Sequence, residues 1–237
     1  MIVPALNEEE ALRPTVEMLL SVVERLFDDF EILIINDGSV DSTPIIAAEL
    51  AATRTGVRVV HHDANRGLGY CYREGMVLAT KEFVGWIPGD GGGLTSVDDL
   101  TAILGAVGSA DMVLVWIASD TRPFFRLFIS KLYTRLLNAA LGFRVHYYNG
   151  PNVYRRALAI DVLSDTSSYG AFAELQARML RGGHTWIEVP MHNRERVAGR
   201  SRGLRLRNVA GVIKTILRLA WEFRITHRQG RSGHLRA

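Results

Sequence analysis

Residues 31–43 read EILIINDGSVDST, an apolar run that ends in an Asn-Asp-Gly turn and continues into the start of a helix. The four consecutive apolar side chains of ILII predict a strand that is buried on both faces, as in a parallel sheet. Asp37 and Gly38 break this strand, and Asp41 to Thr43 begin a helix expected to run to about Thr53. A strand followed at once by a helix is the repeating unit of a parallel α/β sheet.

The same alternation continues on both sides of this segment. Further strands are expected at Met1–Leu6, Val57–His61 and Phe83–Ile87, with helices opening at Asn7–Glu10 and after the Asn65–Gly69 turn. We therefore predict an α/β fold with a mostly parallel mixed sheet flanked by helices. Ligands of such sheets bind at the carboxyl ends of the strands. The loops expected to matter are Pro4–Glu8, Asp37–Asp41, His62–Gly69 and Pro88–Gly93.

The second half of the chain continues the pattern less regularly. Strands are expected at Asp111–Ile117, Tyr148–Tyr154 and Thr185–Val189, and helices at Phe124–Leu141, Phe172–Arg181 and Asn208–Ile225. The last of these is amphipathic and basic. We predict one α/β domain over residues 1–205, followed by a basic amphipathic helix and tail over residues 206–237.

Charge is distributed unevenly along the 237 residues, although the net charge is only +3. From Arg194 onward there are twelve basic and two acidic residues, which leaves sixteen basic and twenty-three acidic residues in 1–193. A basic end of this kind favours a phosphate-rich partner, meaning anionic lipid, a phosphorylated substrate or nucleic acid, or else it is a solubilising tail. The nucleic-acid alternative is disfavoured, because stacking aromatics are not interleaved with the basic residues.

Cysteine, histidine and hydropathy restrict the class of protein further. A single cysteine, Cys71, excludes an internal disulfide and predicts no cysteine-based metal site, and the seven histidines lack metal-ligand spacing. Charged residues interrupt every run of 18 residues, so no transmembrane helix is expected, and no leader sequence is recognised. We expect a cytoplasmic protein, peripheral at the cytoplasmic face of the membrane.

Eight segments, taken in order, carry a family resemblance. VPALNEEEAL (3–12), ILIINDGSVDST (32–43), NRGLGYCYREGM (65–76) and VGWIPGD (84–90) resemble the family 2 glycosyltransferases, which have the GT-A fold. RLFIS (126–130), YNGPNVYRR (148–156), FAELQARMLRGGHTWIEVP (172–190) and RVAGRSR (196–202) are similar to the dolichol-phosphate mannosyltransferase branch, whose members glycosylate a polyprenyl phosphate. The first strand begins at Met1, several residues shorter than family members usually have, so either the start lies upstream or the sheet edge is clipped.

The resemblance implies a donor site for a nucleotide sugar of the GDP-mannose or UDP-glucose type. It assigns donor binding to Pro4, Leu6, Asn7, Glu8, Asp37, Ser39, Asn65, Gly67, Gly69 and Gly89. Asp90 matches the second aspartate of the family's D-x-D motif, which holds Mg²⁺ or Mn²⁺ against the diphosphate and makes Asp90 the catalytic and metal-binding residue. Pro88 and Gly92 replace usual ligand positions, so a weakened metal site is expected. On the residues alone, Asp37 could equally be a helix cap, and Asp90 a turn residue.

The acceptor that the resemblance implies is a phosphate. A polyprenyl phosphate is mostly a dianion at neutral pH, so it can act as a nucleophile without a general base, but it needs cations to hold it. By resemblance these are Arg126, with Ser130 one turn later, and Arg196, Arg200 and Arg202; the alternative is a solvated basic face. The helix at Asn208–Ile225 is expected to bind a membrane surface or, equally, to pack on the core or on a second subunit.

These observations predict an inverting transfer of a sugar from a nucleotide sugar to a polyprenyl phosphate. Two alternatives stay open: transfer to a cell-wall or capsule glycan, and a degenerate non-catalytic nucleotide-sugar-binding protein, which the changes at Pro88 and Gly92 would favour. The sequence leaves the sugar, the nucleotide and the oligomeric state open.

Overall fold

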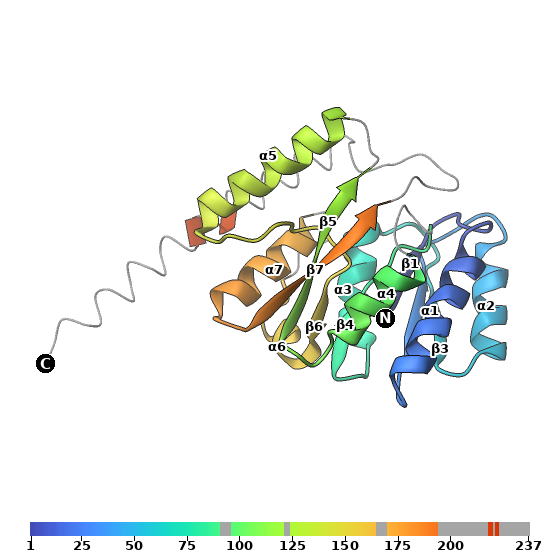
Figure 1. Cartoon of the computed structure of the whole chain (residues 1–237). Coiled ribbons are helices and arrows are strands. Elements are labelled where there is room, and N and C mark those ends of the chain that lie inside the picture. The colour runs from blue at the N-terminus through green and yellow to red at the C-terminus, as the bar shows by residue number, and fades with distance from the viewer. Residues whose placement is uncertain (91–95, 121–123, 165–169, 194–217, 220, 223–237) are drawn as a thin grey trace, which may run out of the picture.

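The computed structural model describes residues 1–90, 96–120, 124–164, 170–193, 218–219 and 221–222. Strands and helices alternate along the chain, as Figure 1 shows. The strands are β1 (Ile2–Ala5), β2 (Ile32–Asn36), β3 (Val57–His61), β4 (Phe83–Gly85), β5 (Met112–Asp120), β6 (Val153–Arg155) and β7 (Trp186–Asn193). The helices are α1 (Leu12–Leu26), α2 (Thr43–Thr53), α3 (Leu68–Leu78), α4 (Val97–Gly105), α5 (Phe124–Leu141), α6 (Arg156–Asp161) and α7 (Ala171–Arg181).

The strands form one mixed sheet in two hydrogen-bonded parts. β1, β2 and β3 are parallel neighbours, and β4, β6, β5 and β7 form the second part, in which β6 is antiparallel to β4 and β5. A parallel bridge between Ile2 and Trp86 joins β1 to the end of β4, and the amide of Ile87 donates to the carbonyl of Ile2 at 2.9 Å. The spatial order is therefore β3-β2-β1-β4-β6-β5-β7. The predicted α/β fold is confirmed.

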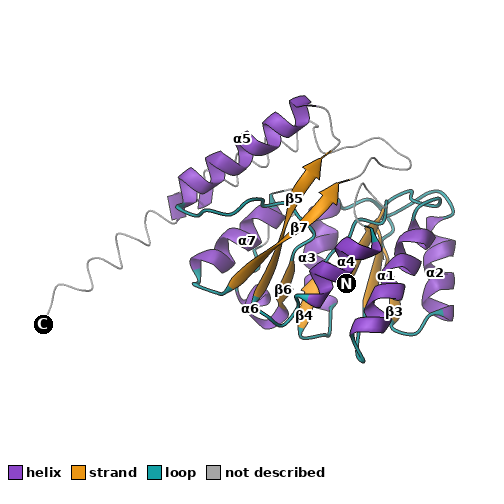
Figure 2. Cartoon of the chain, in the orientation of Figure 1, coloured by secondary structure: helices purple, strands orange, loops and turns teal. Residues whose placement is uncertain are grey.

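Side-chain alternation in β2 explains why helices cover both faces of the sheet (Figure 2). Leu33 and Ile35 pack into a core cluster with residues of α3 and α7. Ile32 and Ile34 point to the other face and pack with residues of α1 and α4. All four side chains are at most 1% exposed, which agrees with the expectation of a doubly buried strand.

The predicted start of the first helix was wrong. α1 begins at Leu12, whereas Asn7–Glu10 forms a turn in which Asn7 has a left-handed φ of 55°. The polar side chains of this turn serve a neighbouring loop and not their own helix: Asn7 Oδ1 accepts from the amide of Val40, and Glu9 Oε2 accepts from the amide of Ser42. β6 is also shorter than predicted, and α4 and α6 were not predicted.

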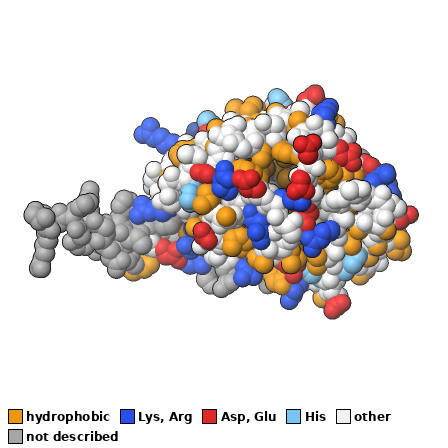
Figure 3. Space-filling view, turned by 90° about the horizontal axis from the view of Figure 1, so that it is seen from below, with side chains coloured by type: hydrophobic (Ala, Val, Ile, Leu, Met, Phe, Trp, Pro, Cys, Tyr) orange, Lys and Arg blue, Asp and Glu red, His pale blue; other side chains and the backbone are white. Residues whose placement is uncertain are grey.

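Ion pairs cover the opposite end of the sheet, where the parallel strands begin. Arg58 pairs with Glu31, Lys81 with Asp29, and Arg155 with both Glu82 and Asp111. Figure 3 views the molecule from this side and shows acidic and basic side chains interspersed. Among the described residues, neither charge forms a continuous patch on this face.

Most of the expected tail lies outside the described residues. Short helical pieces at 218–219 and 221–222 are described; Leu219 is buried in the cluster on the α3 and α7 side, and Trp221 is 70% exposed. The predicted boundary at residue 205 falls in the undescribed range. Among the described residues, every helix is too short or too polar to cross a membrane.

Candidate functional site

The loops that follow β1, β2 and β4 meet at one end of the sheet. The amide of Asp37 donates to the carbonyl of Ala5 on one side of β1, and the amide of Gly89 donates to the carbonyl of Pro4 on the other side, both at 2.9 Å. Asp90 follows Gly89 directly. The structure therefore brings the predicted residues Asp37 and Asp90 to the same end of the sheet, on either side of β1.

Hydrogen bonds lock the loop after β1 onto the loop after β2. The amide of Asn7 donates to Ser39 Oγ at 3.0 Å, and the amide of Glu8 donates to Thr43 Oγ1 at 2.8 Å. Ser39 in turn donates its amide to Asn36 Oδ1 at 3.2 Å. Of the other donor residues predicted in the first loop, Pro4 is buried and Leu6 is partly buried. These two loops thus form one rigid edge.

Asp37 is the centre of a second set of contacts, and its side chain is almost fully buried. Oδ1 accepts from the amide of Arg66 at 2.8 Å and lies 2.9 Å from Nδ1 of His62; Oδ2 accepts from the amide of Gly67 at 2.9 Å. The carboxylate therefore fixes the loop between β3 and α3 against the end of β2. The sequence predicted Asp37 as a contact to the nucleotide, and its visible contacts are to this loop.

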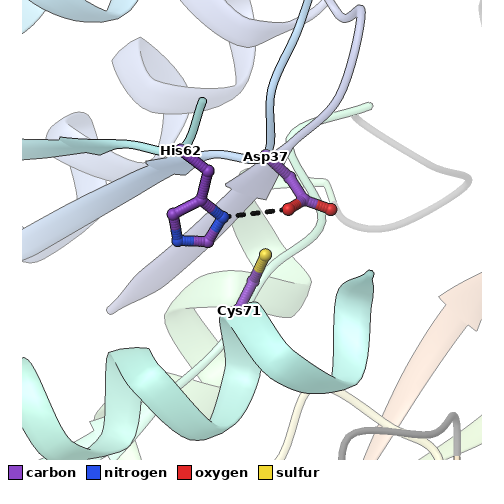
Figure 4. A group of neighbouring side chains, drawn as sticks. All are labelled: Asp37, His62 and Cys71. Carbon is purple, nitrogen blue, oxygen red and sulfur yellow. Dashed lines mark hydrogen bonds and ion pairs between the residues drawn. The ribbon is translucent and has the colours of Figure 1, made fainter. Parts of the chain in front are cut away.

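His62 and Cys71 complete the surroundings of Asp37 (Figure 4). Nε2 of His62 lies 2.6 Å from Glu74 Oε2, so both ring nitrogens face a carboxylate. Burial is the largest influence on the His62 pKa and lowers it, but hydrogen bonds to Asp37 and Glu74 together outweigh burial and raise the pKa. Burial, reinforced by the charge of Asp37, raises the pKa of the Cys71 thiol far above its ordinary value.

Two glycines show how closely the loops approach one another. A Cβ on Gly38, which has a φ of 70°, would lie 2.5 Å from the carbonyl carbon of Ala64. A Cβ on Gly89 would lie 2.9 Å from the carbonyl oxygen of Pro4. Gly67 also has a left-handed φ, of 92°, which agrees with the predicted tight loop, while Gly69 is buried and Asn65 is exposed.

Arg66 is a residue at this edge that the sequence analysis did not select. Its guanidinium lies 4.0 Å from the centre of the Tyr70 ring and donates to the Tyr70 hydroxyl. Stacking on an aromatic ring pre-orders an exposed arginine for a planar or anionic ligand. The spacing of four residues between Arg66 and Tyr70 was the only feature of the sequence that could have indicated this contact.

Asp90 is partly exposed in the turn that follows β4. Mg²⁺ in nucleotide sites commonly takes one or two carboxylates together with water and phosphate oxygens, so a single carboxylate is an adequate protein ligand. Pro88, two residues earlier, offers no side-chain oxygen, and Gly92 lies outside the described residues. Asp90 thus offers one carboxylate as a ligand for such a cation.

The predicted acceptor residues are only partly described. Arg126 and Ser130 both lie in α5, one turn apart; Ser130 is partly buried, and the Arg126 side chain is not among those described. Arg196, Arg200 and Arg202 lie outside the described residues. Of the predicted acceptor residues, the structure therefore describes only the side chain of Ser130.

Comparison with known proteins identifies the family. Residues 1–164 match the model described as Glycosyl transferase family 2. The chain is 29% identical over 214 residues to the polyprenol monophosphomannose synthase of Mycolicibacterium smegmatis, covering 85% of this chain and 79% of that protein. It is 28% identical over 242 residues to the undecaprenyl-phosphate mannosyltransferase of Micrococcus luteus, covering 93% and 95%. The predicted resemblance to the polyprenyl-phosphate branch is confirmed.

A solved structure confirms the fold. The glucosyl-3-phosphoglycerate synthase from Mycobacterium tuberculosis, in complex with Mn²⁺, uridine diphosphate and phosphoglyceric acid, superimposes with a TM-score of 0.69 at 22% identity and covers 92% of this chain and 77% of that chain. This likeness supports the GT-A arrangement and, at such low identity, only that. Together with the family match, it shows that the chain belongs to glycosyl transferase family 2 and is a glycosyltransferase.

Proposed function

We propose that this glycosyltransferase moves one sugar from a nucleotide sugar to a polyprenyl phosphate, with inversion at the anomeric carbon. The observation that carries the proposal is the meeting of Asp37 and Asp90 on either side of β1, at the sheet end where α/β proteins bind ligands. The two relatives described above suggest the acceptor, because both are named for a polyprenyl carrier lipid.

The geometry of this edge supports a set of donor roles. The locked loops of Asn7, Glu8 and Ser39 would hold the base and ribose, and Asp37 would support the loop of Asn65 and Gly67 beneath the nucleotide. Asp90 would hold Mg²⁺ or Mn²⁺, which neutralises charge on the departing diphosphate. Arg66, which stacks on Tyr70, would add positive charge near the diphosphate and so compensate for a metal site in which Pro88 stands at a usual ligand position.

The acceptor step needs no protein nucleophile. An oxygen of the lipid phosphate forms the new bond to the anomeric carbon, while the bond from that carbon to the diphosphate breaks on the opposite face and its electron pair leaves with the nucleotide. Since the phosphate is already a dianion, no base has to remove a proton. Arg126 and Ser130 on α5, with Arg196, Arg200 and Arg202, would hold it.

The exposed face of α5 supports a lipid acceptor. Phe128, Leu132 and Leu136 follow one another at intervals of four, so they share a helix face, and each is about half exposed. Lys131 and Arg135 are exposed beside them, and α5 contains no acidic residue. We call these five residues the α5 face. An apolar stripe flanked by cations suits the surface of an anionic membrane, and the proposal places the protein there as a peripheral enzyme.

Transfer of label into lipid tests the proposal. Purified protein would be given polyprenyl phosphate, Mn²⁺ or Mg²⁺, and a panel of radiolabelled UDP- and GDP-sugars, and the organic phase would be counted. We expect label in the organic phase with at least one donor. Label that appears only in a water-soluble glycan would favour the cell-wall or capsule alternative, and nucleotide binding without any turnover would favour the non-catalytic alternative.

A further inference from the structure

We propose that Asp37, His62 and Cys71 form a second cation site, separate from Asp90, that binds a thiophilic divalent ion such as Zn²⁺. One ligand atom from each residue lies within 4.8 Å of the other two. The three side chains come from the end of β2, the residue after β3 and the first turns of α3, and they converge in Figure 4. The proposal rests on this geometry and does not depend on the proposed acceptor or donor.

The three ligand types select the ion. A carboxylate oxygen, an imidazole nitrogen and a thiolate sulfur together suit Zn²⁺ or Co²⁺, whereas Mg²⁺ and Mn²⁺ prefer oxygen ligands. In tetrahedral zinc sites neighbouring ligand atoms are separated by about 3.2–3.8 Å. The observed cluster is therefore already near the size that an ion requires. Water can occupy the fourth position.

The partners of His62 are those of a metal-binding histidine. Metal-bound imidazoles usually give their second ring N–H to a carboxylate, which fixes the ring and strengthens the ligand. Glu74 Oε2, 2.6 Å from Nε2 of His62, takes this place, and it leaves Nδ1 directed at Asp37. A bound ion would take the places of the protons on Nδ1 and on the Cys71 thiol, and both protons would leave to solvent.

Asp37 is held in position whether or not an ion is present. The amides of Arg66 and Gly67 donate to its two oxygens. For an ion to enter, the contacts of the carboxylate with His62 and with the Cys71 thiol would have to open. Cys71 is fully buried, and burial keeps its thiol protonated in the absence of an ion. The competing interpretation is a hydrogen-bonded cluster that needs no metal.

Sequence spacing could not reveal this cluster. Its members are 25 and 9 residues apart, and none belongs to a short metal-binding motif. The prediction that the chain has no cysteine-based metal site was drawn from Cys71 being alone in the sequence. Folding supplies the other two ligands from different elements.

Cobalt absorption gives a clear test on the full chain. Because Cys71 is the only cysteine, a sulfur-to-cobalt charge-transfer band reports on this site alone. We expect one equivalent of Co²⁺ to produce the band in metal-free wild-type protein, excess Zn²⁺ to remove it, and Mg²⁺ to leave it unchanged. Zn²⁺ affinity should fall at least about tenfold in Cys71→Ser and His62→Gln, and it should be unchanged in His61→Gln, the matched control for the neighbouring exposed histidine.

The Co²⁺ titration of the wild-type protein can overturn the proposal by itself, so the test does not depend on any variant folding correctly. A Co²⁺ titration that yields no charge-transfer band would show that Cys71 is not a ligand. Equal Zn²⁺ affinity in wild type and Cys71→Ala, with matching circular dichroism spectra, would show that any zinc binds elsewhere. Either outcome leaves the hydrogen-bonded cluster as the correct description, and neither bears on sugar transfer.

Discussion

Asp37 shows how one residue can organise a site. Its carboxylate receives two backbone amides and faces His62, so a single side chain joins the ends of β2 and β3 to the start of α3. A buried carboxylate is costly unless its oxygens are hydrogen-bonded, and here the amides of Arg66 and Gly67 satisfy it. The position of the β3–α3 loop thus depends on the charge and shape of this one residue.

Replacing Asp37 by asparagine should therefore destabilise the protein. The amide group of Asn offers one acceptor oxygen in place of two, so the N–H of Arg66 or Gly67 loses its partner. The expected loss in the free energy of unfolding is about 1–3 kcal/mol, measured by urea denaturation. Asp63→Asn, an exposed aspartate in the same loop, should leave stability within about 0.5 kcal/mol of wild type. Equal stability of Asp37→Asn and Asp63→Asn would contradict this account of Asp37.

At the scale of elements, one aspartate ties the starts of two strands to the end of a third. Asp111 Oδ2 accepts from the Thr185 amide at 3.0 Å and from its hydroxyl at 2.8 Å, and Asp111 Oδ1 accepts from Arg155 Nε at 3.2 Å. Asp111 and Thr185 directly precede β5 and β7, and Arg155 is the last residue of β6. The hydrogen bonds from Thr185, and then the contact with Arg155, lower the pKa of Asp111.

The lowered pKa predicts how stability should depend on pH. Because the ionised form is favoured in the folded state, its contribution is complete above the unfolded pKa of about 3.9 and is lost as pH falls through the lower folded pKa. Asp111→Asn should cost on the order of 1 kcal/mol at pH 7, a low value because solvent screens the group. The difference in unfolding free energy between this variant and wild type should disappear as the pH is lowered below about 4. If the difference in stability between Asp111→Asn and wild type persists in acid, the role given to the Asp111 carboxylate is wrong. The same holds if the exposed Asp161→Asn produces an equal loss of stability.

Several elements could be predicted from sequence because their own residues determine them. The ILII run of β2 and the apolar helix α5 were predicted almost to the residue, since burial on both faces and length leave few alternatives. The start of α1 was not, because Asn7 and Glu9 look like a helix start but bond to the loop after β2. β6 was overpredicted, as Tyr148 and Asn152 are buried by side-chain contacts and not by strand pairing.

The site, too, could be predicted from the sequence only in part. The sequence order of the loops predicted that Asp37 and Asp90 would share a sheet end, because parallel strands place their carboxyl ends together. It could not predict the partners of Asp37, since His62, Arg66 and Gly67 reach it only through the packing of α3. Contacts between loops form only once the chain has folded, and they produce no periodic pattern in the sequence.

For the whole molecule, the α5 face predicts binding to membranes. Replacing Phe128, Leu132 and Leu136 by serine should weaken binding to vesicles that contain anionic lipid by about 100-fold, because three half-exposed apolar side chains can no longer enter the surface. The measurement is co-sedimentation with vesicles. Ile45→Ser with Val77→Ser removes two exposed apolar residues elsewhere and should leave binding unchanged. Equal loss in both variants would mean that α5 is not the membrane-facing side, and unchanged vesicle binding in the triple variant would favour a protein partner for α5.

Calorimetric titration with UDP and GDP, with and without Mn²⁺, tests most directly whether the end of the sheet at Asp37 and Asp90 is the donor site. The wild type should bind at least one nucleotide more tightly when Mn²⁺ is present, and Asp90→Ala should lose that dependence on metal, with transfer reduced at least about 100-fold. Asp28→Ala removes an exposed carboxylate between α1 and β2, at the opposite end of the sheet, and should behave as wild type. Metal-dependent nucleotide binding that survives in Asp90→Ala, or that is lost equally in Asp28→Ala, would contradict the account.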